Sequence, residues 1–467
     1  MTTRRDFLET GGLGFGALAL GDLLKRQSLA DAERAVTPLS ARSPQLPGTA
    51  RNVIFLFMQG GPSQLETFDP KPVLRKFDGK LLPKDLQDYD LAQINTADAT
   101  VMAPRFSFQK YGESGQEISS IFPQLAQHAD RLAIVRSMHH DLFIHGSAMI
   151  MMHSGTQLLG HPSAGAWIVY GLGCQSQNLP AYIAMTDGIF RNGASMYSSG
   201  FLPAVYQGTD MRIQGAPIQN LSRHKSISAG EQRRLLDQIN AWNRLHRSTR
   251  PGDSRLDAHI SNYELAFRMQ SAAPELIDLS GETRQTQQLY GIGDGKPSDR
   301  YGKMCLMGRR MVERGVRYVQ LICGGWDAHG DTQGNHTSQG QKVDQPIAGL
   351  ISDLEQRGLL DTTLLVWVGE FGRTPIKQGT NGRDHHPYGF SAFLAGGGIQ
   401  GGKTIGATDD FGFAAVDDKV HVNDLHATML GLMGIDHEEL TYLFEGRYRR
   451  LTDVGGQNNL AARLVRG

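Results

Sequence analysis

Carboxylate, imidazole and guanidinium side chains follow several short apolar runs of the sequence. In chain order the candidates are His145, Asp327, His329, Glu370, Arg373, His385 and His386. Aspartate and histidine are common ligands of zinc, iron and manganese. Asp327 and His329 are one residue apart, so both can face the same way on an extended segment. Arginine pairs well with phosphate or sulfate oxygens. These residue types predict a site for a metal ion or an anion.

Each of these residues also has a simpler interpretation. A single histidine or aspartate in a loop is more often solvated or caps a helix, and Arg373 has the alternative of a surface salt bridge. The whole set favours a site, because chance would not concentrate such residues after apolar runs.

The elements that must position these residues are short buried strands. Runs of β-branched, aliphatic and aromatic residues predict parallel strands at 52–58, 132–135, 182–185, 318–322, 364–368 and 390–395. Helical patterns lie between or after them, at 147–153, 231–246, 256–269, 303–313, 343–357 and 424–433. This alternation predicts an α/β fold with a doubly wound sheet. Ligands of such sheets bind beyond the carboxyl ends of the strands, where the candidate residues stand.

Composition indicates a folded chain with a large core and excludes some functions, while the length allows about three domains or one large α/β domain. The chain has 467 residues, 40% of them hydrophobic, and its 47 basic and 47 acidic residues leave no net charge. That balance argues against a nucleic-acid partner. Glycine is in excess, at 56 residues, and many glycines end predicted strands, so we expect them, including 396–398, beside the site. The three cysteines form no disulfide framework or zinc ribbon, which predicts buried free thiols.

The N-terminus carries a targeting pattern. Arg4-Arg5 precede Phe7-Leu8 and an apolar run to Leu20, and this resembles a twin-arginine signal. We predict a signal peptide over 1–30, a linker over 31–50, an α/β domain over 51–455 and a tail over 456–467. The segment 188–298 lacks a strong strand, which predicts a helical insertion or lid. The twin-arginine export machinery is then a partner, and the location is periplasmic or extracellular. No later run is apolar for 18 residues, so no permanent membrane span is expected in the mature protein. Retention of the signal as an anchor stays open.

One motif is misleading. Residues 397–404, GGIQGGKT, fit the pattern of a phosphate-binding loop. Such a loop must open a helix, yet the glycines and β-branched residues that follow predict a turn into a hairpin.

The run of motifs resembles the DUF1501 family, which is placed in the alkaline phosphatase and sulfatase superfamily. The motifs are MQGGPSQLETFDPKP, GGWDAHGD, VGEFGRTP, GRDHHP and GGGIQGGKTIGATDDFG, and the resemblance covers about 45–455. It implies a three-layer α/β/α sandwich around a mostly parallel sheet. It also implies one or two divalent metal ions, zinc, manganese, calcium or magnesium, that activate a Ser, Thr or modified Cys nucleophile.

The sequence departs from that superfamily's pattern at several positions. The nucleophile usually stands nine residues before the Thr of a Thr-Gly pair, and the same count back from Ser154-Gly155 reaches His145. An imidazole there can ligate a metal, act as a base or take up a phosphoryl group. Gln59 stands where an aspartate ligand is usual, and Glu370-Phe371 lacks the usual imidazole. One metal position therefore resembles the superfamily's, formed by Asp327, His329 and either His385 or His386, and the second is degraded.

Three functions follow from these observations. The first is an exported metal-dependent hydrolase of phosphate or sulfate esters, in which His145 and Glu370 complete the site or transfer protons and Arg373 binds the anion. The second is a catalytically degenerate binding protein for sulfated or phosphorylated glycans. The third is a structural or partner-binding protein of the cell envelope, without metal or pocket.

Overall fold

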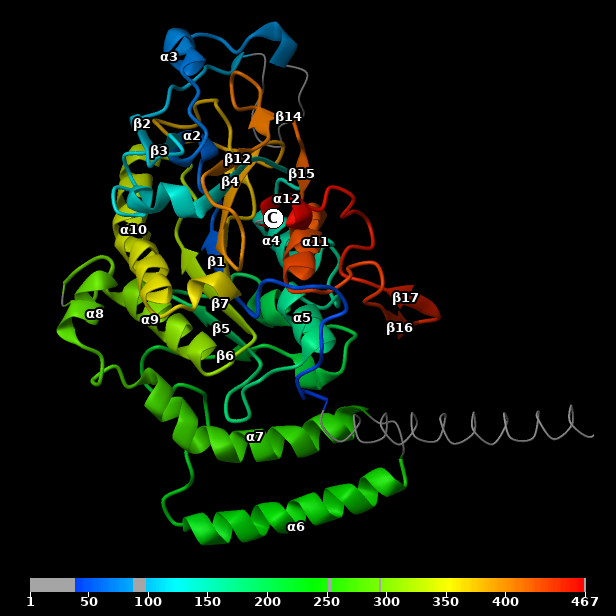
Figure 1. Cartoon of the computed structure of the whole chain (residues 1–467). Coiled ribbons are helices and arrows are strands. Elements are labelled where there is room, and N and C mark those ends of the chain that lie inside the picture. Colours follow the sequence, from blue (N-terminus) through cyan, green and yellow to red (C-terminus); the bar gives the residue numbers. More distant parts are fainter. Residues whose placement is uncertain (1–37, 87–97, 251–253, 294, 466–467) are drawn as a thin grey trace, which may run out of the picture.

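A nine-stranded sheet lies between two layers of helices in the computed structural model, which describes residues 38–86, 98–250, 254–293 and 295–465 (Figure 1). The predicted three-layer α/β/α sandwich is confirmed. The predicted signal peptide, 1–30, and the first part of the linker lie outside the described residues.

The strand order in the sheet is β12-β4-β11-β8-β1-β7-β5-β6, and β15 pairs with β4. The strands are β1 (Asn52–Gln59), β4 (Leu132–His139), β5 (Tyr182–Thr186), β6 (Thr209–Asp210), β7 (Tyr318–Gly324), β8 (Thr363–Val368), β11 (Phe390–Gly396), β12 (Lys403–Ile405) and β15 (Val420–His421). All six predicted strands are therefore present. Among the described strands of this sheet, β11 alone runs antiparallel to its neighbours, β4 and β8.

The central strands are mostly apolar because helices cover both faces of the sheet. In β1, Val53, Phe55 and Phe57 face one hydrophobic core, and Ile54, Leu56 and Met58 face the other. The first core contains α4 (His145–Ser154), α5 (Ala164–Leu172), α11 (Val422–Leu432) and α12 (Ala461–Leu464). The second contains α9 (Asp299–Glu313) and α10 (Thr332–Gln356). Figure 1 shows the two groups on opposite sides of the sheet.

The predicted helices are present, and α10 begins well before its predicted start at 343. No sequence pattern indicated the helix α5. Its residues AGAWIVYGL are almost all apolar and mostly buried, so no alternation of polar and apolar faces marks it as a helix.

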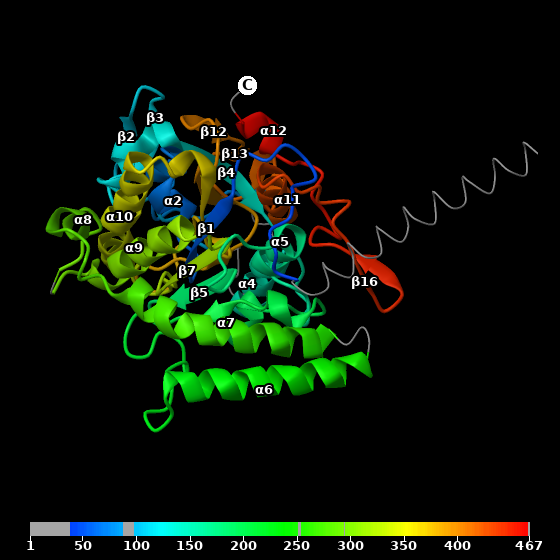
Figure 2. The same cartoon turned by 60° about the horizontal axis from the view of Figure 1, so that its bottom comes forward.

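The segment 188–298 contains short 3₁₀ turns, β6, and the helices α6 (Ala229–Ser248), α7 (Ser254–Ile277) and α8 (Arg284–Leu289). A capping box between Ser228 and Glu231 starts α6. The helices α6 and α7 form an antiparallel pair at the outside of the molecule, with α6 outermost (Figures 1 and 2).

The reversed direction of β11 corrects one prediction about the glycines. Gly396, at the end of β11, pairs with Leu364, at the start of β8. The glycines 396–398 therefore lie at the edge of the sheet opposite the carboxyl ends of the parallel strands, away from the predicted site. The GGIQGGKT motif leads into strand β12 rather than a helix, which agrees with its exclusion as a phosphate-binding loop.

The remaining elements are small. They are α2 (Gln64–Thr67), α3 (Val73–Phe77), β2 (Phe108–Tyr111), β3 (Gln116–Ser119), β9 (Gly372–Arg373), β10 (His385–His386), β13 (Ala407–Thr408), β14 (Ala415–Asp417), β16 (Tyr442–Phe444), β17 (Arg447–Arg449) and α12. The three cysteines are buried free thiols, as predicted. Within the described ranges, every helix is too short or too polar to cross a bilayer.

Candidate metal centre

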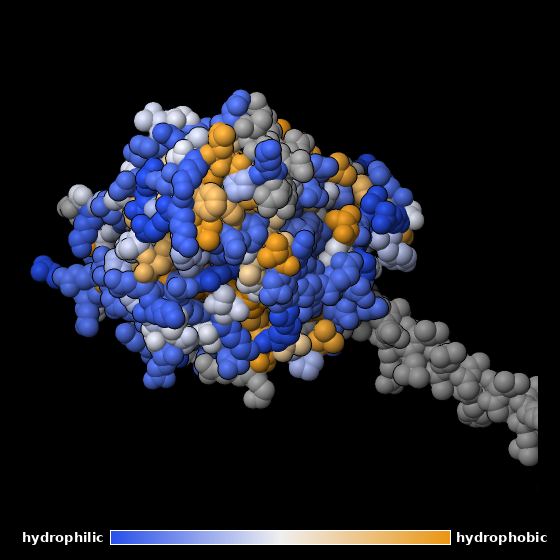
Figure 3. Space-filling model, turned by 90° about the horizontal axis from the view of Figure 1, so that it is seen from above, coloured by the Kyte–Doolittle hydropathy of each residue, from blue (hydrophilic) through white to orange (hydrophobic). Residues whose placement is uncertain are grey.

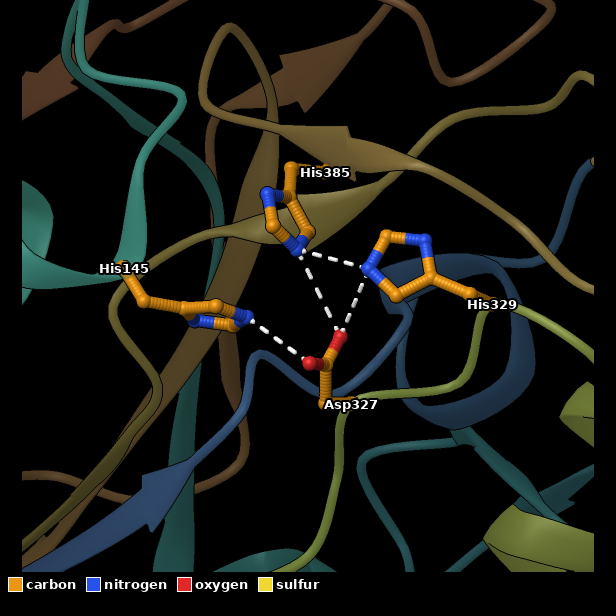
Figure 4. A group of neighbouring side chains, drawn as sticks. All are labelled: His145, Asp327, His329 and His385. Carbon is orange, nitrogen blue, oxygen red and sulfur yellow. Dashed lines mark hydrogen bonds and ion pairs between the residues drawn. The ribbon is translucent and has the colours of Figure 1, made fainter. Parts of the chain in front are cut away.

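Four side chains from distant parts of the sequence meet at the carboxyl end of the parallel strands (Figure 4). His145 is the first residue of α4, and Asp327 and His329 lie in the loop after β7. His385 lies on β10, where it pairs with Arg373 of β9. Each of the four residues contributes one ligand atom, and these four atoms all lie within 4.8 Å of one another. The antiparallel direction of β11 explains how His385 reaches this edge, because β11 begins where its neighbours end.

Three of the ligand atoms form a tight triangle. The Nε2 atoms of His329 and His385 are 3.0 Å apart. They lie 3.0 and 3.4 Å from Oδ1 of Asp327, respectively. Bonds of about 2.0–2.1 Å to a tetrahedral ion place its ligand atoms about 3.3 Å apart. The triangle therefore has the size of one face of a metal coordination shell.

The other ring nitrogens of these two histidines have fixed partners. Nδ1 of His329 lies 2.5 Å from the side-chain oxygen of Gln378. Nδ1 of His385 lies 2.8 Å from the carbonyl oxygen of Phe143. Since an acceptor oxygen requires a proton on the facing nitrogen, each neutral ring keeps its Nε2 lone pair free. Two lone pairs then face each other across 3.0 Å, an arrangement that a cation between them would stabilise.

His145 approaches the same carboxylate from the side of its second oxygen. Its Nε2 lies 3.1 Å from Oδ2 of Asp327, but without hydrogen-bond geometry, and this buried atom has no hydrogen-bond partner among the described residues. Its Nδ1 lies 2.6 Å from Oε1 of Glu370. Glu370 is fully buried and also accepts hydrogen bonds from the backbone N–H of Gly60, at 2.9 and 3.1 Å. Glu370 thus orients His145 and fixes its protonated nitrogen.

Position 60 must be glycine for this arrangement. Gly60 has a φ of 117°, and an added Cβ would lie 2.5 Å from the backbone nitrogen of Asp327. The turn after β1 therefore brings its backbone directly against the loop that carries Asp327.

Arg373 lies behind the site rather than facing its opening. Its side chain has no exposed surface, and it donates to Oδ1 of Asp327 at 2.8 Å. Its other hydrogen bonds go to the backbone carbonyls of Gly60, Gly61 and Arg383. An incoming anion cannot reach this guanidinium, so the geometry assigns it the positioning of Asp327 in place of the predicted contact with an anion.

The neighbouring histidines 385 and 386 point in opposite directions, as alternate residues of a strand must. His386 is fully buried, and its Nε2 meets the carbonyl oxygen of Phe413. Burial lowers the pKa of His386 to about 4. The structure therefore brings His385 into the group and leaves His386 outside it. Gln59, the other residue singled out at a ligand position, contacts the backbone of Ile189 and Arg191 instead.

Two residues that sequence reasoning missed complete the surroundings. Arg191 follows β5 in the inserted segment, and its guanidinium lies 3.7 Å from Oδ2 of Asp327 with a side chain that is 40% exposed. Phe371 is buried, and its ring lies against those of His145 and His385. Arg191 stands in no motif, so only its place after a strand could have identified it.

The charges of the site reinforce one another. Burial alone would raise the pKa of Asp327, but its close contacts with His145 and His385 and the charge of Arg373 hold it well below its usual range. Burial alone would lower the pKa of His145, but its contacts with Asp327 and Glu370 outweigh that effect and raise it. Asp327 is thus a permanent carboxylate, which a metal ligand must be.

Comparison with known proteins identifies the family. The family model described as "Protein of unknown function (DUF1501)" matches residues 50–463. The chain belongs to the DUF1501 family. No curated protein matches it.

Several solved structures are similar in fold to this DUF1501 member. The lipoteichoic acid synthase LtaP from Listeria monocytogenes is 10% identical, with 87% of this chain and 78% of that chain covered and a TM-score of 0.38. A protein in the alkaline phosphatase superfamily from Vibrio parahaemolyticus is 10% identical, with coverages of 88% and 76% and a TM-score of 0.37. The PsFucS1 sulfatase from Pseudoalteromonas sp. is 10% identical, with coverages of 87% and 72% and a TM-score of 0.35.

Proposed function

We propose that this chain is an exported, metal-dependent hydrolase of phosphate or sulfate esters, with chemistry like that of sulfatases and alkaline phosphatases. The observation that carries the proposal is the convergence of two histidine lone pairs and one permanent carboxylate oxygen within 3.0–3.4 Å of one another. No hydrogen bond satisfies the two facing nitrogens when both Nδ1 atoms carry protons, whereas a metal ion does.

The residues of the triangle fit a metal of the zinc or manganese type. Two imidazoles and one carboxylate are the ligands that zinc takes in catalytic sites, with a further position open. Calcium and magnesium prefer oxygen ligands throughout, so the two nitrogens argue against them. His329, His385 and Asp327 would hold the ion. A metal in such a site polarises an ester oxygen and lowers the pKa of a bound water.

The chain's own residues would supply the remaining functions. Glu370 holds the proton on Nδ1 of His145, so that Nε2 of His145 can accept a proton at the reaction centre. Arg191 is the exposed cation nearest Asp327 and would contact an oxygen of the substrate anion. Arg373 keeps Asp327 in place from behind.

A second candidate function is binding of sulfated or phosphorylated glycans without turnover. It is favoured by the imidazole at the start of α4, where related enzymes carry a hydroxyl or thiol. The nearest hydroxyl along the chain is that of Ser147, which donates to the carbonyl of Ile144 at 3.1 Å. Both candidate functions need the metal, and only the first needs proton transfer by His145.

The test begins with metal content. The full chain is purified from cytoplasmic and exported fractions, its metals are measured, and it is assayed on aryl phosphates, phosphodiesters and sulfates. Asp327→Ala should abolish both metal and activity. Asp361→Ala, which changes an exposed aspartate in the 3₁₀ turn before β8, should change neither. Metal with glycan binding but no turnover would support the second function. Metal-free protein from every fraction would contradict both.

A further inference from the structure

The outer helix α6 carries an apolar stripe that nothing in the described part of the chain covers. Leu235, Trp242 and Leu245 are 50%, 63% and 70% exposed. At 100° per residue these three positions fall on one side of the helix. The opposite side holds Leu236 and Asn240, which are buried within the antiparallel pair of α6 and α7, called the hairpin below. The stripe is therefore separate from the face that packs in the fold.

The segment around this stripe is strongly basic in a chain without net charge. Between positions 223 and 250 there are seven Lys or Arg residues and two acidic ones, Glu231 and Asp237. Arg233 is engaged, since it pairs with Asp237 and with Glu264 of α7. Arg234 and Arg244 are exposed, and no carboxylate of the described ranges lies within ion-pair distance of either.

The hairpin also stands where the chain enters the fold. Pro38, the first described residue, and Leu39 line a pocket together with Ile260, Ser261 and Leu265 of α7. The described part of the chain therefore begins beside this hairpin. Figures 1 and 2 show α6 as the outermost element there, held away from the sheet by α7. The opposite face, seen from above in Figure 3, is mostly hydrophilic.

We propose that α6 is a membrane-surface contact that binds the anionic headgroups of a lipid bilayer. A helix that combines Trp and Leu on one side with arginines beside them lies in the headgroup region, where apolar burial and attraction to anionic lipids act together. Its 20 residues span about 30 Å, so the whole stripe can lie flat. This contact is independent of the metal centre and would hold the domain at the membrane without crossing it.

Charge favours a lipid surface over a second copy of the chain as the partner. Pairing two α6 helices along their stripes would bring two basic segments together, each with the same excess of arginine. An anionic bilayer neutralises that charge while it buries the stripe. The apolar stripe likewise favours lipid over nucleic acid, whose phosphates would contact only the arginines.

The chain contains a built-in probe for the test. Of its four tryptophans, Trp167, Trp326 and Trp367 are at most 1% exposed, and Trp242 alone is exposed. A change in tryptophan emission on lipid binding therefore reports on α6, whatever the N-terminal segment does. The full chain is mixed with vesicles of phosphatidylcholine alone or with phosphatidylglycerol, with and without brominated acyl chains.

We expect a blue shift and quenching by brominated lipid only with the anionic vesicles, both weakened by high salt. Each arginine near an anionic surface contributes about fivefold to partitioning, so Arg234→Gln with Arg244→Gln should weaken it about 25-fold. The matched control is Arg75→Gln with Arg447→Gln, two exposed arginines on α3 and β17, which should have little effect. Vesicle binding with unchanged Trp242 emission would overturn the proposal. So would a blue shift without lipid that grows with protein concentration, which would identify a second copy as the partner.

Discussion

Two adjacent histidines give opposite predictions for metal binding. His385 directs Nε2 into the triangle with Asp327 and His329. His386 directs its Nε2 to the carbonyl of Phe413 in the core. Replacing each in turn by glutamine makes the same chemical change one position apart. We expect His385→Gln to remove metal affinity and His386→Gln to remove stability while it leaves metal affinity unchanged.

The sizes of the two effects follow from the contacts. Loss of a group that only orients a ligand typically weakens metal binding about 10–100-fold, so loss of a ligand should exceed about 100-fold. At a metal concentration 100 times the Kd, bound metal stabilises the native chain by about 2.7 kcal/mol. That metal concentration is about equal to the Kd expected for the His385→Gln variant, so bound metal would stabilise the variant by only about 0.4 kcal/mol. His386→Gln should lose about 1–3 kcal/mol without metal, since its buried hydrogen bond is removed, and should keep the full gain from metal.

The assay measures urea unfolding of the three proteins with and without zinc or manganese, and Kd by competition with a chelator. The difference between the two unfolding curves of each protein isolates the contribution of the metal. An equal metal gain in all three proteins would refute the ligand assignment. A larger loss of metal gain in His386→Gln than in His385→Gln would show that the other histidine binds the ion.

Four further predictions concern single residues around and away from the site. Glu370→Gln should lower ester hydrolysis about 10–100-fold and metal affinity much less, because it acts through His145. Arg191→Gln should raise KM for an anionic ester about tenfold with little change in kcat, since its contact is the same before and during reaction. Glu66→Gln should cost about 3–5 kcal/mol in urea unfolding without altering metal affinity, because Glu66 and Arg383 form a fully buried ion pair. Burial raises the pKa of Asp344 to about 6. The native state thus keeps a proton that the unfolded chain releases, so the free energy of unfolding falls by about 3 kcal/mol as pH rises from about 4 to 6. The Asp344→Asn variant should not show this fall.

Each of these four has a result that would contradict it. For Glu370→Gln, the contradicting result is a metal Kd that rises as much as it does in His329→Gln, because His145 would then be a metal ligand. For Arg191 it is a lower kcat at unchanged KM. For Glu66 it is a change in metal affinity as large as the change in stability. For Asp344 it is an equal pH slope between pH 4 and 6 in the wild-type chain and the Asn variant.

The strands and most helices could be predicted because their signals are local. An apolar run such as 52–58 ended by two glycines reads as a buried parallel strand wherever it occurs. The helix α5 could not be predicted, since burial on all sides removes the periodicity that marks a helix. The direction of β11 was also beyond local reasoning, because it depends on the connection between β8 and β11. That direction moved the glycines 396–398 to the far edge of the sheet.

The candidate site was predictable in its residue types and only partly in its geometry. Asp327, His329 and His145 were identified by their places after strands. The choice between His385 and His386 required the pairing of β9 with β10, which sets which ring faces Arg373 and which faces the core. The role of Arg373 could be assigned only from its contacts in the structure. An arginine that follows a strand has the same sequence pattern whether its guanidinium faces solvent or three backbone carbonyls.

The charge balance of the site explains why both of its candidate functions depend on a metal ion. The carboxylates of Asp327, Glu370 and Asp384 face the guanidiniums of Arg373 and Arg191, which leaves one net negative charge when the histidines are neutral. Protonation of His145, whose pKa its carboxylate partners raise, brings the sum to zero. The chain as a whole has no net charge, so no general field attracts an anion to this edge. A metal-free site therefore offers a phosphate or sulfate group no net attraction at short range, whereas a divalent ion makes the site positive and gives the anion a partner beside Arg191. Anion binding should therefore depend on metal both for an esterase and for a glycan-binding protein.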